Sequence, residues 1–168
     1  MPVHYTGFVV REPPAAPAGR GGHVLVSTGG GLVGEPLLRA AIEAQRLGTG
    51  LPMRAIAGPL MPENAFERLK GEADGVPDLE LLRSVPDLAA ELAGATAAVS
   101  QAGYNTTLEI VRTGVPALVV PYATPEEDEQ VRRARRLERL GVLRVRDRVD
   151  AVSLAREIRR LEQFAPTT

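Results

Sequence analysis

Short apolar segments alternate with amphipathic segments along most of the chain. The apolar segments, which predict buried strands, lie at 23–27, 53–58, 79–83, 96–100, 116–121 and 142–145. The amphipathic segments, which predict helices, lie at 36–46, 63–70, 86–95, 106–112, 126–140 and 150–162. Strands that alternate with helices are typical of βαβ units, whose parallel sheet is covered by helices on both faces. The pattern therefore predicts an α/β fold with a doubly wound parallel sheet.

Loops at the carboxyl ends of these strands are the expected location of a binding site. In doubly wound sheets, ligands bind at this edge, near the point where the strand order reverses. The loops in question follow Ser27, Arg83, Ser100 and Pro121.

The beginning of the chain has a different character. A further strand is predicted at 3–10, and the next stretch, "REPPAAPAGRGG", is rich in proline and glycine, which suits an extended loop or linker. We therefore expect residues 1–22 to form a strand and a linker, and residues 23–168 to form one α/β domain. A chain of 168 residues can bury a full core without a metal or a disulfide.

Composition narrows the chemistry and the partners. The chain has no cysteine, a formal net charge of −1 and 4% aromatic residues, which excludes thiolate chemistry and argues against a nucleic-acid partner. It contains neither a signal-peptide pattern nor an apolar run that could span a bilayer, so we expect a soluble, cytoplasmic protein. His4 and His23 stand at strand beginnings, away from the expected binding edge. No catalytic triad, metal-ligand cluster or general base is found, so no catalytic residue, metal or cofactor is predicted.

The stretch "STGGGLVGEP", residues 27–36, is a glycine-rich turn between a predicted strand and a predicted helix. Such a turn allows a close approach of the backbone to a ligand, and amides at a helix start can bind phosphate oxygens. The stretch lacks the Lys-Ser/Thr pair of a P-loop and fits the dinucleotide pattern only loosely. Phosphate binding and a plain tight turn are both open from these residues alone.

The stretch "SQAGYNTTLEI", residues 100–110, lies at another junction of strand and helix. Thr106 and Glu109 stand three apart, which is the capping-box spacing, with Thr106 as N-cap. Alternatively, the Glu109 carboxylate could accept hydrogen bonds from a vicinal diol such as a ribose. The local sequence favours the cap.

Charge is concentrated in "PYATPEEDEQVRRARRLERLG", residues 121–141. Acids at a helix start and arginines toward its end complement the helix dipole, and Glu129 with Arg133 forms a favourable i, i+4 pair. Only Glu129 and Gln130 are expected to face a ligand. The arginines from Arg132 to Arg148 are expected to form a solvated face rather than a membrane contact.

Three motifs in this order, "SQAGYNTTLEI", "TGVPALVVP" and "EDEQVRRARRL", give the chain a family resemblance. It resembles the C-terminal, nucleotide-sugar-binding half of GT-B glycosyltransferases and is similar to family 28, which includes the peptidoglycan N-acetylglucosaminyltransferase. The resemblance runs from about residue 5 to about residue 161. It implies a Rossmann-like fold and a donor, with UDP-sugar expected, for an inverting, metal-independent transferase. It also implies that an N-terminal domain supplies the acceptor-binding site and the catalytic base. The fragment alone is then expected to be inactive, with membrane contact only through the full-length enzyme.

The resemblance also implies roles for individual positions. Glu109 would bind the ribose, and backbone groups around Val85 would contact the nucleobase. Glu129 and Gln130 would contact the transferred sugar. Arg11, four residues after Gly7, would lie near the donor. The donor phosphates would meet two loops, whose expected contacts are Thr28, Gly29, Gly30, Gly31, Ala102, Gly103, Asn105 and Thr106.

Two departures from the family pattern limit what can be transferred. Gly30 stands where relatives often carry a serine, and Glu129 stands where the peptidoglycan enzyme has a glutamine. Two other functions are open: half of a non-hydrolysing UDP-sugar 2-epimerase, and a stand-alone module that binds a nucleotide or docks a partner. The epimerase would need acid and base side chains that are not found here.

Overall fold

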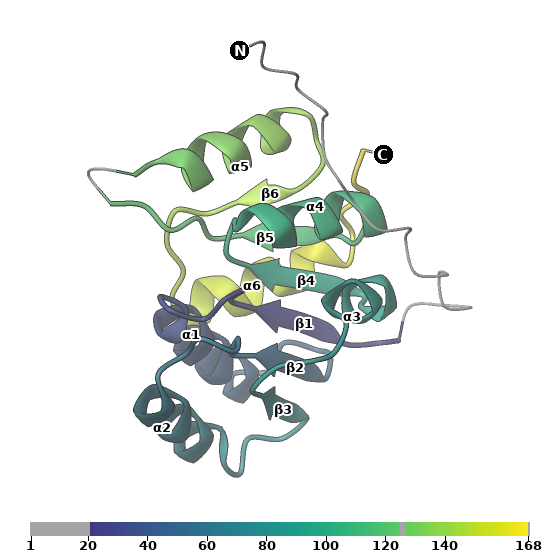
Figure 1. Cartoon of the computed structure of the whole chain (residues 1–168). Helices are drawn as coiled ribbons and strands as arrows, with labels where there is room; N and C mark the ends of the chain where they lie inside the picture. The colour runs from purple at the N-terminus through teal and green to yellow at the C-terminus, as the bar shows by residue number, and fades with distance from the viewer. Residues whose placement is uncertain (1–20, 125–126, 168) are drawn as a thin grey trace.

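The computed structural model describes residues 21–124 and 127–167, which form an alternating α/β domain (Figure 1). The strands are β1 (Val24–Ser27), β2 (Met53–Ile56), β3 (Leu79–Leu82), β4 (Ala97–Ser100), β5 (Ala117–Val119) and β6 (Arg144–Val145). The helices are α1 (Glu35–Arg46), α2 (Glu63–Ala73), α3 (Leu88–Gly94), α4 (Tyr104–Thr113), α5 (Glu129–Arg139) and α6 (Ala151–Leu161). Each predicted strand and helix from residue 23 onward is present, with bounds shifted by a few residues. The strand predicted at 3–10 lies outside the described residues, as does most of the predicted linker.

The strands form one parallel sheet in the order β3-β2-β1-β4-β5-β6. The prediction of a doubly wound parallel sheet is therefore confirmed. The chain winds outward from β1 through β2 to β3, then returns to the other side of β1 and continues through β4 and β5 to β6. The strand order thus reverses between β1 and β4, which makes this the switch point of the sheet.

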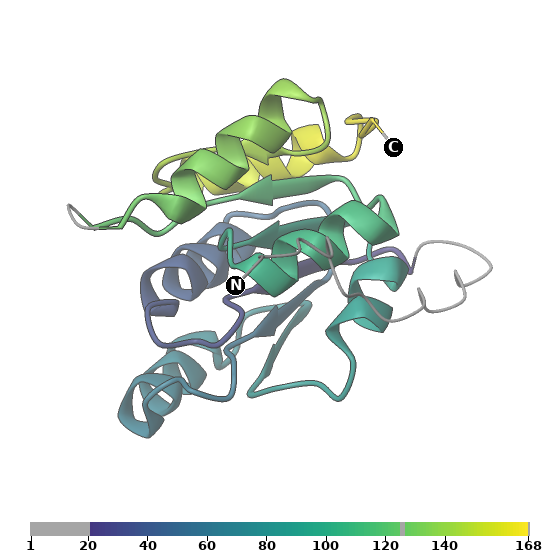
Figure 2. The same cartoon turned by 45° about the horizontal axis from the view of Figure 1, so that its top comes forward.

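Alternation of side chains along the strands divides the core into two layers. Val24 and Val26 of β1 pack on one face with residues of α1, α2 and α6, whereas Leu25 packs on the other face with residues of α3, α4 and α5. Figure 2 shows helices on both sides of the sheet. Because both faces are covered, the edge formed by the carboxyl ends of the strands is left for a ligand.

Candidate functional site

The switch point brings two of the predicted loops side by side. Ser27 and Ser100, the last residues of β1 and β4, are register partners in the sheet. The backbone N–H of Gln101 donates to the carbonyl of Ser27 at 3.3 Å, which extends the pairing into the loops. The glycine-rich loop and the turn before α4 therefore begin from the same point on the sheet edge.

Close backbone packing requires glycine in the loop after β1 and in the loop after β2. A Cβ atom at Gly31 would lie 2.4 Å from the carbonyl oxygen of Ala57, and one at Gly58 would lie 2.4 Å from the carbonyl oxygen of Gly29. Thr28 is buried, and its hydroxyl donates to the carbonyl of Ala57. The loop after β1 is thus fixed against the loop after β2, and the Thr28 side chain is occupied within the protein.

Gly29 lies at the meeting of this loop and α4. A Cβ atom at Gly29 would be 3.4 Å from Oγ1 of Thr106, and Gly29 has a φ of 61°. Gly30 is exposed, and its nearest neighbour would be the Leu60 side chain at 3.5 Å. The structure therefore brings together the two segments from which phosphate contacts are predicted, 28–31 and 102–106.

The capping-box prediction for Thr106 and Glu109 is wrong. Helix α4 begins at Tyr104, and its N-cap is Gly103, which makes no side-chain capping hydrogen bond. Thr106 is therefore already the third helical residue and is buried, and Glu109 lies a further turn along. The Glu109 carboxylate instead accepts from Nη1 of Arg112 at 2.9 and 3.0 Å, and 25% of its side chain is exposed.

Arg133 connects the start of α5 to the turn that precedes α4. The Glu129 carboxylate pairs with Arg133, as the i, i+4 spacing predicts, and Oε1 of Gln130 accepts from the backbone N–H of Tyr122 at 3.2 Å. Arg133 also donates from Nη1 to the carbonyl of Ala102 at 2.9 Å. The sequence did not predict this hydrogen bond between α5 and the loop after β4, because Arg133 and Ala102 are far apart in the sequence.

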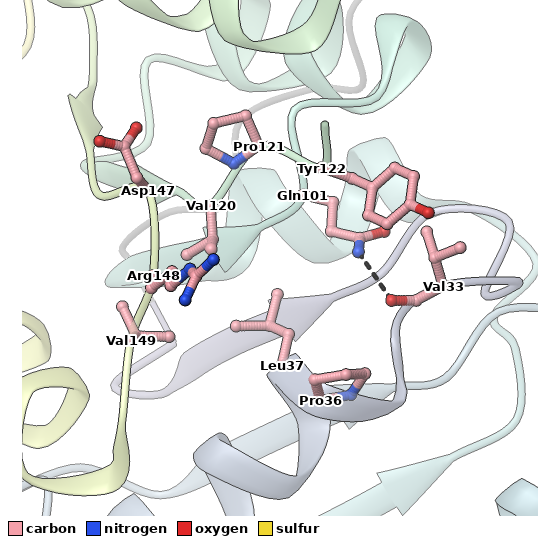
Figure 3. Close-up of a pocket in the computed structure, with 10 residues that line it drawn as sticks. All are labelled: Val33, Pro36, Leu37, Gln101, Val120, Pro121, Tyr122, Asp147, Arg148 and Val149. Atoms are coloured by element: carbon pink, nitrogen blue, oxygen red, sulfur yellow. Dashed lines mark hydrogen bonds between the residues drawn. The ribbon is translucent and has the colours of Figure 1, made fainter. Parts of the chain in front are cut away.

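A pocket of about 350 Å³ opens beside these loops at the carboxyl ends of β5 and β6 (Figure 3). Within it, Nε2 of Gln101 donates to the carbonyl of Val33 at 3.1 Å. The pocket contains none of the predicted donor contacts but adjoins them, because Gln101 precedes Ala102 and Tyr122 bonds to Gln130. Its lining residues are Val33, Pro36, Leu37, Gln101, Val120, Pro121, Tyr122, Asp147, Arg148 and Val149. Sequence reasoning missed this lining because it comes from four separate segments, and only the rule that ligands bind at strand ends points to it.

One residue predicted to contact the donor, Val85, lies apart from the residues around the switch point. Val85 follows β3, at the far end of the sheet from β5, and it is half-buried against the core layer of α3, α4 and α5. Arg11 lies outside the described residues. Within 21–124 and 127–167, no group of His, Cys, Asp or Glu side chains has an arrangement suited to a metal ion, and no helix is long and apolar enough to cross a membrane.

Fold and site together define a Rossmann-like α/β domain with a pocket beside the loops of its switch point. The family model for the glycosyltransferase family 28 C-terminal domain matches residues 53–167, and the chain belongs to this family.

The curated relatives agree with this assignment, and the solved structures agree with the fold. The chain is 31% identical over 150 residues to the UDP-N-acetylglucosamine–N-acetylmuramyl-(pentapeptide) pyrophosphoryl-undecaprenol N-acetylglucosamine transferase of Azoarcus sp. (strain BH72), covering 87% of this chain and 42% of the relative. It is similar in fold to the glycotransferase of kitacinnamycin, with a TM-score of 0.63, 22% identity, and coverage of 96% of this chain and 43% of the other. It is also similar to Acinetobacter baumannii MurG, with a TM-score of 0.60, 19% identity, and coverage of 90% and 48%. The chain thus spans less than half the length of each of these proteins.

Proposed function

We propose that this domain binds the nucleotide-sugar donor of a glycosyltransferase, and that the donor is a UDP-sugar. The observation that carries the proposal is the convergence of Gly29 and the first turn of α4 at the switch point. Backbone amides at a helix start and a close glycine backbone suit a diphosphate. The name of the Azoarcus relative contains UDP-N-acetylglucosamine, which supports uridine as the base.

The strand order suggests how the donor would lie along the sheet edge. The diphosphate would occupy the switch point, between Gly29 to Gly31 and the start of α4. The base would extend toward Val85, after β3, and Glu109 would accept from the ribose hydroxyls. The sugar would extend the other way, toward Glu129, Gln130 and the pocket after β5 and β6. In this arrangement the diphosphate, the nucleobase and the sugar lie at the carboxyl ends of different strands.

The proposed reaction transfers the sugar to an acceptor oxygen with inversion and without a metal ion. As the bond to the sugar breaks, negative charge grows on the leaving diphosphate, where amides of the loops and Arg11 would stabilise it. The acceptor-binding site and the general base would belong to an N-terminal domain, connected through residues 1–22. The chain alone is therefore expected to bind the donor but not to transfer its sugar.

The first test is a calorimetric titration of the domain with UDP, TDP and GDP, together with Glu109→Ala. We expect preferential binding of UDP, and at least a tenfold loss of affinity in Glu109→Ala, because two ribose hydroxyls lose a charged acceptor. Since Glu109 has no capping role, the loss of its i, i+3 pair should lower stability by only about 0.2–0.5 kcal/mol.

Glu43→Ala is the matched control, because Glu43 forms the same kind of i, i+3 pair with Arg46 on α1. It should leave UDP affinity unchanged. If the wild-type domain binds none of the three nucleotides, the donor-site proposal fails and a docking module becomes the better description. Sugar transfer by the chain alone would contradict the proposed need for a second domain. Epimerisation of a UDP-sugar by the joined domains would favour the epimerase.

A further inference from the structure

Arg133 on α5 makes three contacts with the start of α4 and of α5. Its guanidinium donates to the carbonyl of Ala102 at 2.9 Å, pairs with the Glu129 carboxylate, and lies over the Tyr104 ring at 5.3 Å from the ring centroid. Only 20% of its side chain is exposed. A guanidinium can serve these partners at once because its donors form a planar fork that also stacks on aromatic rings.

The hydrogen bond to the Ala102 carbonyl also orients the N–H of the same peptide group, which belongs to Gly103. In a trans peptide the carbonyl oxygen and the following N–H point in opposite directions. Because Arg133 draws the Ala102 carbonyl toward α5, the N–H of Gly103 is directed away from α5. The glycine-rich loop follows β1, which pairs with β4 on the side opposite β5, and Gly29 of this loop lies beside Thr106 of α4. No hydrogen bond from the Gly103 N–H occurs within the described part of the chain.

The pair with Glu129 has a second consequence. An unpaired carboxylate at the start of α5 would repel an anionic ligand at the neighbouring loop. Pairing with Arg133 offsets that charge and fixes the orientation of the carboxylate.

We propose that Arg133 is a positioning residue of the donor site, which aims the Gly103 amide at the diphosphate and holds the Glu129 carboxylate in place. This role rests on the proposed function. Arg133 acts through these two groups, with no direct contact to the donor required.

Arg132 provides a matched control one residue earlier. It forms the same i, i+4 type of ion pair, with Asp128 at 2.9 Å, but 75% of its side chain is exposed. Arg132→Ala therefore removes an arginine and an ion pair from α5 without touching the turn before α4.

The experiment is an NMR titration of the ¹⁵N-labelled protein with UMP and with UDP. The variants are Arg133→Ala, Arg133→Lys and Arg132→Ala. In the wild type and in Arg132→Ala, UDP should shift the Gly103 amide signal and bind more tightly than UMP. In Arg133→Ala, the ratio of UDP to UMP affinity should fall about tenfold, because the loss concerns an amide aimed at the diphosphate. Arg133→Lys should restore part of the ratio, since one ammonium can keep the charge but not all three contacts.

Melting temperatures of all variants separate positioning from folding. If Arg133→Ala melts far below Arg132→Ala, the Arg133→Lys variant provides the test instead. A ratio of UDP to UMP affinity in Arg133→Lys equal to that of the wild type would then overturn the proposal. The proposal is also overturned if Arg133→Ala folds and keeps the UDP to UMP ratio of Arg132→Ala. Absence of binding by the wild type would instead refute the donor site itself, and the role of Arg133 with it.

Discussion

Gly30 and Gly31 are neighbours in the loop after β1, yet their surroundings differ. Gly30 is exposed, and a Cβ atom there would make an ordinary contact with Leu60 at 3.5 Å. Gly31 has a φ of 96°, and its Cβ would lie 2.4 Å from a backbone oxygen. We therefore expect Gly30→Ser to change the free energy of unfolding by less than about 0.5 kcal/mol. We expect Gly31→Ala to lower the free energy of unfolding by about 1–3 kcal/mol. Denaturant unfolding of both variants measures this difference.

The same Gly30→Ser variant probes the proposed phosphate contact. It introduces the serine that the family resemblance implies at this position, and its hydroxyl would be a new donor to the diphosphate. We expect UDP affinity to rise by a few-fold, as the gain from one added hydrogen bond is about 0.5–1.5 kcal/mol. An unchanged or weaker UDP affinity in a well-folded Gly30→Ser protein would indicate that this loop does not meet the phosphates.

At the scale of residues, the sequence indicated motifs but not the contacts that join distant segments. The glycine-rich loop and Glu109 stand out as motifs, and the structure brings the loop to the start of α4. The Arg133 bond to Ala102 and the pocket lining could not be predicted, because they join segments that are distant in the sequence. Such contacts depend on the strand order, which local patterns do not encode.

At the scale of elements, α6 has the clearest capping interaction. The Asp150 carboxylate accepts from the backbone N–H of Ser153 at 2.8 Å, and the Ser153 hydroxyl accepts from the backbone N–H of Asp150 at 3.0 Å. The hydrogen bond from the Ser153 backbone is the main reason that the pKa of Asp150 is lowered. A lowered pKa in the folded state means that this contribution to stability is present above the unfolded pKa and is lost as pH falls through the folded pKa.

We therefore expect Asp150→Ala to lower the melting temperature at pH 7, with a difference from wild type that shrinks below about pH 4, where the unfolded carboxylate begins to protonate. Asp150→Asn should retain the cap, because an amide oxygen also accepts this hydrogen bond, but should remove its pH dependence. Melting curves of the three proteins between pH 2.5 and 7 measure the effect. A constant difference between Asp150→Ala and wild type across this range would contradict the assignment.

The start of α4 shows why element boundaries were harder to predict than elements. The apolar positions gave the helix, but the spacing of Thr106 and Glu109 suggested a cap too far along. The backbone turn at Gly103 starts the helix at Tyr104 instead, without a side-chain cap. At the other end, Gly114 stops the helix in the left-handed conformation, with a φ of 59°. A glycine conformation thus sets the end of the helix, whereas the φ of −59° at Gly103 is one that any residue adopts.

The parallel sheet followed from the sequence because its strands β1, β4 and β5 are buried on both faces. Continuous apolar runs such as 97–99 have no polar face, so they indicate a parallel sheet between two helix layers. The order of the strands did not follow from these runs. It fixes which loops meet at the switch point, and only the structure supplies it.

The strand order also determines which part of the donor would reach the pocket. In the proposed arrangement the nucleotide ends at the switch point, and only the sugar extends to the pocket beside β5 and β6. Val33 lines this pocket and is 39% exposed, so a larger side chain there can fill it without disturbing the core. We expect Val33→Trp to weaken binding of a UDP-sugar about tenfold while changing UDP affinity by less than twofold. Val152→Trp is the control, because Val152 is 58% exposed on α6 and outside the pocket lining. Calorimetry with UDP-N-acetylglucosamine and UDP measures both affinities. Equal losses for the two ligands would mean that the nucleotide occupies the pocket, which would reverse the proposed direction of the donor along the sheet edge.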